Sequence, residues 1–79
     1  MPSSETLESA YAFYIHVSEM FKKHSLVYYE VLFAQLAISS ASLDVDISSL
    51  RSTVIKGYTD LGRYDDAYAA FVATPFNEQ

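Results

Sequence analysis

Two histidines are the side chains in this sequence best suited to binding a metal ion or moving protons. His16 and His24 lie eight residues apart, which on a helix is about two turns and roughly 12 Å along the axis. That spacing is too wide for both to bind one metal without further ligands. We therefore interpret His16 as a surface or hydrogen-bonded residue. His24 suits the negative end of a helix dipole, and we expect no metal site.

Two pairs of carboxylates could support other chemistry. Asp44 and Asp46 resemble the start of a calcium-binding loop, but the glycine and the distant bidentate glutamate of such a loop are missing. We expect these aspartates to act as helix N-caps instead. Asp65 and Asp66 are adjacent, so their side chains point in different directions on a helix. This pair predicts a solvated first turn rather than a catalytic dyad.

Nucleophilic and phosphate-binding chemistry also lack the residues that they need. The serines are not set in a Gly-x-Ser-x-Gly elbow, and the only glycines, Gly57 and Gly62, cannot form a phosphate-binding loop. The chain contains no cysteine, which excludes disulfides, cysteine-ligated zinc and thiol catalysis. We therefore expect no enzyme, no catalytic residue and no cofactor.

The composition points to contact with other protein surfaces. The 79 residues permit one small domain, yet 51% are hydrophobic and they include seven Tyr and five Phe. A chain this short buries only roughly 60% of the surface that it exposes when unfolded. Either the helices pack unusually well, or part of this apolar surface meets another chain or further repeats.

The charge, the N-terminal sequence and the lack of cysteine restrict the classes of partner and the cellular compartment that we expect. The net charge is −5, and the only adjacent cations are Lys22 and Lys23, so direct nucleic-acid binding and docking on anionic lipid are not expected. The polar N-terminus does not read as a signal peptide. The most apolar stretch, residues 26–38, is too short for membrane insertion. The lack of cysteine favours an intracellular setting, because small secreted domains usually need disulfides.

Apolar periodicity predicts an all-α fold of four helices in one segment covering residues 1–79. The expected parts are a helical hairpin at 4–39, a linker at 40–46 and a second hairpin at 47–74. The first turn places Ser25 as the N-cap of a helix over residues 26–39. The third helix is expected to be capped by Asp46, with Asp44 as the alternative.

The two glycines fall in the second hairpin. Gly62 follows directly after the last apolar residue of the third helix, where a left-handed C-terminal cap belongs. Gly57 lies inside that helix, where glycine costs about 1 kcal/mol relative to alanine. Either a neighbouring helix approaches closely there, or the glycine is a tolerated defect.

The apolar stripes predict which helix faces are inside. On the first helix the stripe consists of Ala10, Phe13, Tyr14, Val17, Phe21 and His24. The second helix is apolar nearly all round, which predicts burial on several sides. Ala67, Tyr68, Phe71 and Val72 form the expected inner stripe of the last helix.

The tyrosines divide into two groups. Tyr14, Tyr29, Tyr58 and Tyr68 fall on apolar stripes, which favours core positions with hydroxyls at the rim over interface positions. Tyr11, Tyr28 and Tyr64 are harder to place inside, and core and interface stay equally open for them. Because aromatic side chains are frequent anchors of protein interfaces, these three are the candidate protein-interface residues.

The stretch from Leu61 to Phe71, LGRYDDAYAAF, resembles the turn and second-helix opening of a tetratricopeptide repeat. In that motif Gly62 turns the chain and small Ala67 lets the paired helix approach. The match departs from the repeat at Ile55, where a small residue is usual, and at Pro75, which comes early. One such unit cannot bury its own face.

A longer resemblance covers about residues 11–76. The runs YIHVSEMF at 14–21 and FAQLAI at 33–38, followed by residues 50–75, are similar to the helical region of the nucleoporin 120/160 family. That family is a scaffold subunit of the Y-shaped nuclear pore complex, joining a β-propeller to a long α-solenoid. The resemblance implies a role in nuclear pore assembly, protein transport and mRNA export, at the nuclear envelope and without catalysis.

Three functions remain to be distinguished. The leading hypothesis is a piece of an α-solenoid scaffold nucleoporin that works by helix stacking and protein–protein contact with other chains or neighbouring repeats. The second is a free-standing helical adaptor that binds a peptide or partner helix in a groove lined by Tyr and Phe. The third is a small bundle that carries an apolar ligand. Self-association is expected for an isolated scaffold piece.

Overall fold

The described part of the chain is all-α and contains four helices. The computed structural model describes the backbone of residues 4–42 and 45–74, and the side chains of residues 9–42 and 45–74. The helices are α1 (Ser4–Lys23), α2 (Val27–Ser40), α3 (Ser48–Asp60) and α4 (Tyr64–Ala73). The expected fold class is confirmed, and the helix expected over residues 26–39 spans Val27–Ser40. Asp44 and the tail from Phe76 lie outside the described residues.

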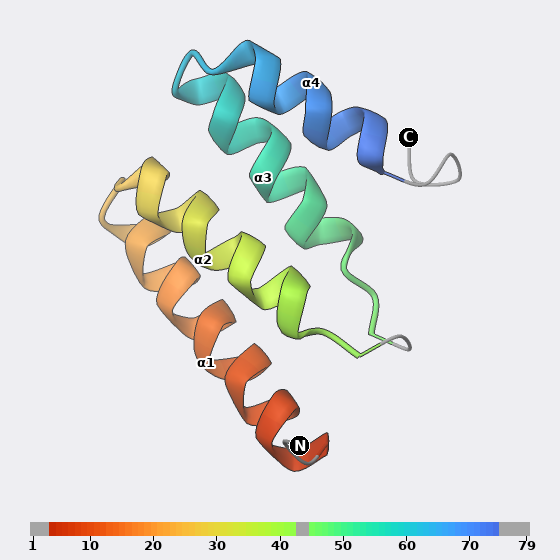
Figure 1. Cartoon of the computed structure of the whole chain (residues 1–79). Helices are drawn as coiled ribbons and strands as arrows, with labels where there is room; N and C mark the ends of the chain where they lie inside the picture. The colour runs from red at the N-terminus through yellow and green to blue at the C-terminus, as the bar shows by residue number, and fades with distance from the viewer. Residues whose placement is uncertain (1–3, 43–44, 75–79) are drawn as a thin grey trace.

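The helices form an open row rather than a closed bundle. In Figure 1 they lie side by side in chain order, antiparallel within each hairpin, with α1 and α4 at opposite ends of the row. Extensive packing within the described residues joins only consecutive helices, α1 with α2, α2 with α3 and α3 with α4. The result is a slab with extents of 37 × 32 × 18 Å. Stacking in chain order is the arrangement of a helical repeat array.

Both hairpins turn in the same way. After α1, the Leu26 amide donates to the Phe21 carbonyl at 2.9 Å and the Ser25 amide donates to the Lys22 carbonyl at 3.0 Å. After α3, the amides of Arg63 and Gly62 repeat this pattern at 2.9 and 3.0 Å. These paired bonds form the Schellman motif, which requires a left-handed residue at its corner. Gly62 occupies that corner with φ +76°, as the sequence predicted.

Ser25 occupies the equivalent corner of the first turn, with φ +60°. The expectation that Ser25 caps α2 is therefore wrong. The turn is so short that the left-handed residue closing α1 directly precedes Leu26, which takes the N-cap position without a side-chain hydrogen bond. The residue type predicts a helix start at Ser25, whereas its backbone forms a helix end.

Asp46 caps the start of α3 as expected, but it lies one residue before the N-cap position. Ile47 is the residue that precedes the first helical position and it makes no side-chain cap. Asp46 supplies the acceptor instead, because its Oδ1 accepts from the Ser48 amide at 3.0 Å and also from the Ser48 hydroxyl. These bonds lower the pKa of the Asp46 carboxyl, because they stabilise its charged form.

The core is small and lies at the junction of α2 with α3. Val31, Ala34 and Val54 are buried there, and partly buried Val27, Ile38, Leu50, Tyr58 and Ala70 surround them. Gly57 allows the two helices to meet, because a Cβ atom at this position would collide with Cγ2 of Val31. The close-approach interpretation of Gly57 is therefore confirmed. No helix in the described part of the chain is long and apolar enough to cross a membrane.

Candidate protein interface

Polar bonds hold the helices in register at two places. Ser18 is buried on α1, and its hydroxyl donates to the Glu30 carbonyl of α2 at 2.9 Å. Between the hairpins, Gln35 Nε2 donates to the Tyr58 hydroxyl at 2.7 Å. The Arg63 guanidinium lies 5.3 Å from the centre of the Tyr58 ring. Tyr58 is thus a junction residue, partly buried as the sequence predicted.

Six aromatic rings form a continuous run across α1 and α2. Phe13 touches Tyr14, and Tyr14 lies 6.1 Å from Phe33 between ring centroids. From Phe33 the run continues through Phe21, Tyr29 and Tyr28, at centroid distances of 5.5, 5.2 and 5.4 Å. Such spacings are within the range in which aromatic pairs attract one another. The contacts orient the rings as one surface.

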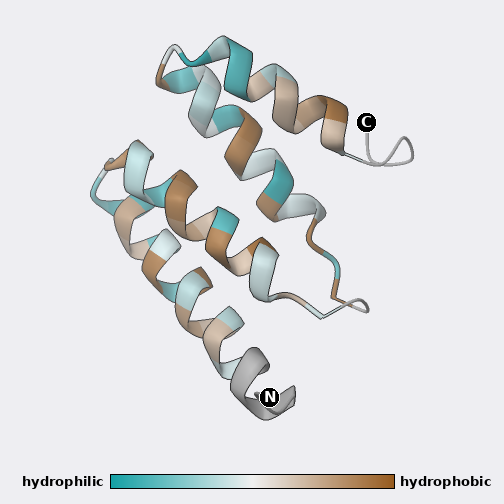
Figure 2. Cartoon of the chain, viewed as in Figure 1, coloured by the Kyte–Doolittle hydropathy of each residue, from teal (hydrophilic) through white to brown (hydrophobic). Residues whose placement is uncertain are grey.

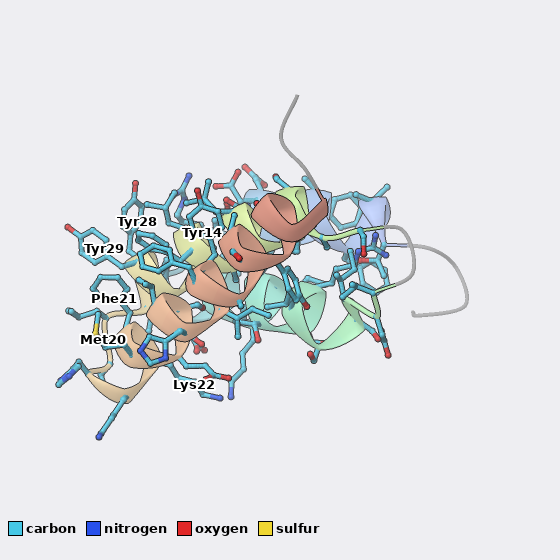
Figure 3. All side chains as sticks on the ribbon, turned by 90° about the horizontal axis from the view of Figure 1, so that it is seen from below. Tyr14, Met20, Phe21, Lys22, Tyr28 and Tyr29 are labelled. Atoms are coloured by element: carbon cyan, nitrogen blue, oxygen red, sulfur yellow. The ribbon has the colours of Figure 1, made fainter. Side chains whose placement is uncertain are left out.

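This surface occupies one side of the first hairpin. Figure 3 shows Tyr14, Tyr28 and Tyr29 on one side of the helix layer and Lys22 on the other. Leu32 and Leu36 extend the surface along α2, since they follow Tyr28 at four-residue intervals and are exposed like it. We name the set the aromatic face; its members are Phe13, Tyr14, Phe21, Tyr28, Tyr29, Leu32, Phe33 and Leu36.

The aromatic face explains the apolar character of α2. Figure 2 shows hydrophobic segments recurring along this helix, and Val31, Ala34 and Ala37 are buried. The sequence predicts that α2 is buried on several sides, and α1 and α3 cover two of its sides. The third side, with Tyr28, Leu32 and Leu36, stays open because no other described helix packs there.

A second apolar surface lies on α4. Tyr64, Tyr68 and Val72 recur at four-residue intervals and are all exposed. The helix packs on α3 through small side chains instead, with Ala67 buried and Ala70 partly buried against the core. The expected inner stripe of α4 is therefore correct at Ala67 and wrong at Tyr68 and Val72, because alanines allow the closest approach to α3. Phe71 is 42% exposed but lies beside Arg51 and Ile55 of α3.

The candidate interface tyrosines lie on three different helices. Tyr28 on α2 and Tyr64 on α4 are 51% and 68% exposed, whereas Tyr11 on α1 is half-buried. Only Tyr28 belongs to the aromatic face. The structure therefore separates the three candidates instead of gathering them into one site.

The tyrosines expected in the core divide evenly. Tyr14 and Tyr58 are partly buried, but Tyr29 is 47% and Tyr68 is 69% exposed. On α1, Phe13 is 59% exposed although the apolar stripe predicts it inside, while Ser18, which is not part of that stripe, is buried. Ser18 follows Tyr14 by four residues and precedes Phe21 by three, so helical spacing was the signal that could have found it.

A hollow of about 490 Å³ opens above α3, between α2 and α4. Its walls are Gln35, Ile38 and Ser39 on one side and Ala70, Ala73 and Thr74 on the other, with Arg51 and Val54 from α3. Among the described residues, no phenylalanine or tyrosine lines it. The expected groove lined by Tyr and Phe is therefore not this hollow.

Metal-binding side chains do not converge in the described part of the chain. No group of three or more His, Asp or Glu residues there could hold an ion, and both His16 and His24 are exposed. The ion pair between Arg63 and Asp66, at 2.8 Å, joins neighbouring turns of one exposed segment. The large features of the surface are apolar, which is typical of protein contacts.

Comparison with known protein families identifies what this fold is similar to. A protein-family model described as "Nucleoporin Nup120, HEAT repeats" matches residues 1–79. No curated protein and no solved structure matches the chain. HEAT repeats are pairs of helices that stack into solenoids, in agreement with the open row of two hairpins.

Proposed function

Because this chain belongs to the HEAT-repeat family of nucleoporin Nup120, we propose that it is a scaffold segment of the Y-shaped complex of the nuclear pore. In this role it acts through helix stacking and protein–protein contacts, within the assembly that carries nucleocytoplasmic transport of protein and mRNA. Its place in the cell is then the nuclear envelope. Other protein chains or neighbouring repeats are its partners, and no cofactor or catalytic step is required.

The open row of helices is the observation that carries this proposal. A closed bundle would bury the large apolar side chains of its end helices, whereas α4 exposes Tyr64, Tyr68 and Val72 at the end of the row. An exposed helix face of this kind suits a neighbouring helix in a repeat array, since each repeat contacts its neighbours. The uncovered faces account for the excess of apolar residues in the composition.

Tyr11, Tyr28 and Tyr64 are the proposed contact residues. Tyr28 and Tyr64 have the exposure that an interface anchor needs, and each belongs to an apolar stripe of its helix. Tyr11 is half-buried, so its contribution would come from the part of the ring that remains accessible. Replacement of all three by Ser should weaken association with the partner, and unchanged association would show that the assignment is wrong.

The scaffold role is tested by measuring where the protein lies in the cell and which proteins co-purify with it. A fluorescently tagged copy expressed in its native cells should give a nuclear-envelope signal and co-purify with Y-complex nucleoporins. The matched variants are Val72→Glu, in the exposed face of α4, and Ser49→Glu, an exposed position on α3. We expect Val72→Glu to lose the signal and Ser49→Glu to keep it. A diffuse wild-type signal without co-purification would contradict the proposal.

A free-standing adaptor is the second candidate, and the aromatic face favours it. Exposed aromatic rings held in mutual contact can receive a partner helix. An adaptor would bind its partner away from the nuclear envelope, so the same localisation experiment separates the two functions. The rings lie on a surface and not around an enclosed space, so no comparable observation favours the carrier of an apolar ligand.

A further inference from the structure

We propose that the aromatic face joins two copies of this chain into a symmetric dimer, with α2 of one copy crossing α2 of the other at Leu32. This inference goes beyond the scaffold role and does not depend on it, since it needs only the surface of the first hairpin. The area of the face, its lack of charge and its spacing along α2 are the three observations behind it.

The exposed area of the aromatic face matches what a dimer needs. Phe13, Tyr28, Tyr29, Leu32 and Leu36 are each between 37% and 59% exposed. With full areas of roughly 150–250 Å² for large side chains, these five expose on the order of 500 Å² of mainly apolar surface. A standard interface buries about 800 Å² on each partner, of which a little over half is apolar.

The face carries no charge, although the chain as a whole has a net charge of −5. The exposed residues of α2 are Tyr28, Tyr29, Leu32, Leu36 and Ser39, all neutral. In a two-fold dimer the same surface patch of both copies forms the contact. A charged side chain on the two-fold axis would therefore face the same charge on the other copy. A neutral apolar face avoids that repulsion and is complementary to itself.

The spacing along α2 gives the register. Tyr28, Leu32 and Leu36 follow one another at intervals of one turn, about 6 Å along the axis. A two-fold axis at Leu32 reverses one α2 against the other. Leu32 then meets Leu32 of the second copy, and Tyr28 meets Leu36 at both ends of the contact.

The mass of the chain in solution is the first test. Sedimentation equilibrium should give a dimer of the 8.9 kDa chain, and Leu32→Glu should raise the dimer Kd by about a hundredfold, because two carboxylates would face each other on the axis. Ala69→Glu, an exposed change on α4 with the same charge, should leave it unchanged. Salt should tighten the dimer by screening the repulsion between two acidic chains.

Cysteine cross-linking tests the register, because the chain has no cysteine of its own. Under mild oxidation Leu32→Cys should form a disulfide-linked dimer about tenfold faster than Ala69→Cys. The dimer interface holds the two thiols at position 32 close together, which raises their effective concentration. Circular dichroism controls for folding of both variants. A monomer at every concentration, association unaffected by Leu32→Glu, or equal cross-linking of the two cysteines would each overturn the proposal. None of these outcomes bears on the nuclear-envelope test.

Discussion

Cγ2 of Val31 occupies the space that a side chain at Gly57 would need. The contact joins α2 to α3 and therefore the first hairpin to the second. Val31 is only 2% exposed and Gly57 is buried. A β-branched residue in a helix has one strongly preferred rotamer, so Val31 cannot turn away at low cost. The missing Cβ atom at Gly57 is what allows the two hairpins to pack.

The first prediction is that Gly57→Ala lowers the unfolding free energy when residue 31 is valine and raises it when residue 31 is replaced by alanine. In the wild type the overpacked junction should lose up to about 2 kcal/mol of unfolding free energy, because a clash of about 1–3 kcal/mol opposes a gain of about 1 kcal/mol in helix propensity. In a Val31→Ala background the clash disappears and the same change should stabilise by about 1 kcal/mol. Urea denaturation of the four proteins measures both effects. Equal effects in the two backgrounds would show that the contact does not limit packing.

The second prediction compares the two left-handed corners. Ser25 has φ +60° and Gly62 has φ +76°, and a residue with a Cβ is strained by roughly 1–2 kcal/mol in this conformation. Ser25→Gly should therefore stabilise the chain by about 0.5–1 kcal/mol and Gly62→Ala should destabilise it by about 1 kcal/mol. A Cβ atom at Gly62 would have open space around it, so backbone strain alone is measured. Thermal unfolding of both variants decides the signs, and a loss of stability in Ser25→Gly would argue against the turn geometry.

The third prediction concerns the hydrogen bond between Gln35 and Tyr58. Its 2.7 Å length links α2 to α3 across the hairpin junction. Tyr58→Phe and Gln35→Ala should each cost about 0.5–1.5 kcal/mol, and the double mutant should cost less than the sum by about 0.5 kcal/mol or more. A double-mutant cycle in urea measures this coupling energy. Gln35→Ala paired with Tyr68→Phe, on exposed Tyr68 of α4, is the control pair and should be additive.

The fourth prediction concerns acid and the start of α3. Bonds from Ser48 lower the pKa of Asp46 in the folded chain. The stabilisation from its charged form is complete above the ordinary carboxyl pKa of about 4 and is lost as the pH falls through the lowered value. Wild-type Tm should therefore fall more steeply below about pH 4 than the Tm of Asp46→Asn, whose amide does not titrate there. Parallel curves for the two proteins would mean that Asp46 does not cap α3 in solution.

The sequence by itself determined the helices and the kind of molecule. Period-3.6 apolar spacing located all four helices, and the Leu61–Gly62 pair marked a left-handed corner because glycine tolerates positive φ. The excess of apolar residues, with seven Tyr and five Phe, indicated contact with other protein surfaces. The family resemblance, carried by runs in both hairpins, is confirmed by the match over residues 1–79. These properties are local, because each is encoded within one segment of the sequence and does not depend on how the segments pack.

Only the tertiary structure decided which apolar faces are covered. Apolar spacing on α4 marks Ala67 and Tyr68 alike, but α3 approaches over the alanine and leaves the tyrosine exposed. In the same way, Phe13 belongs to an apolar stripe yet lies outside, while polar Ser18 lies inside and bonds to Glu30. Burial depends on where the next helix lies, and that follows from close contacts such as Gly57 with Val31. Periodicity shows that a helix has an apolar face, but the choice between core and interface depends on which helices are present to cover it.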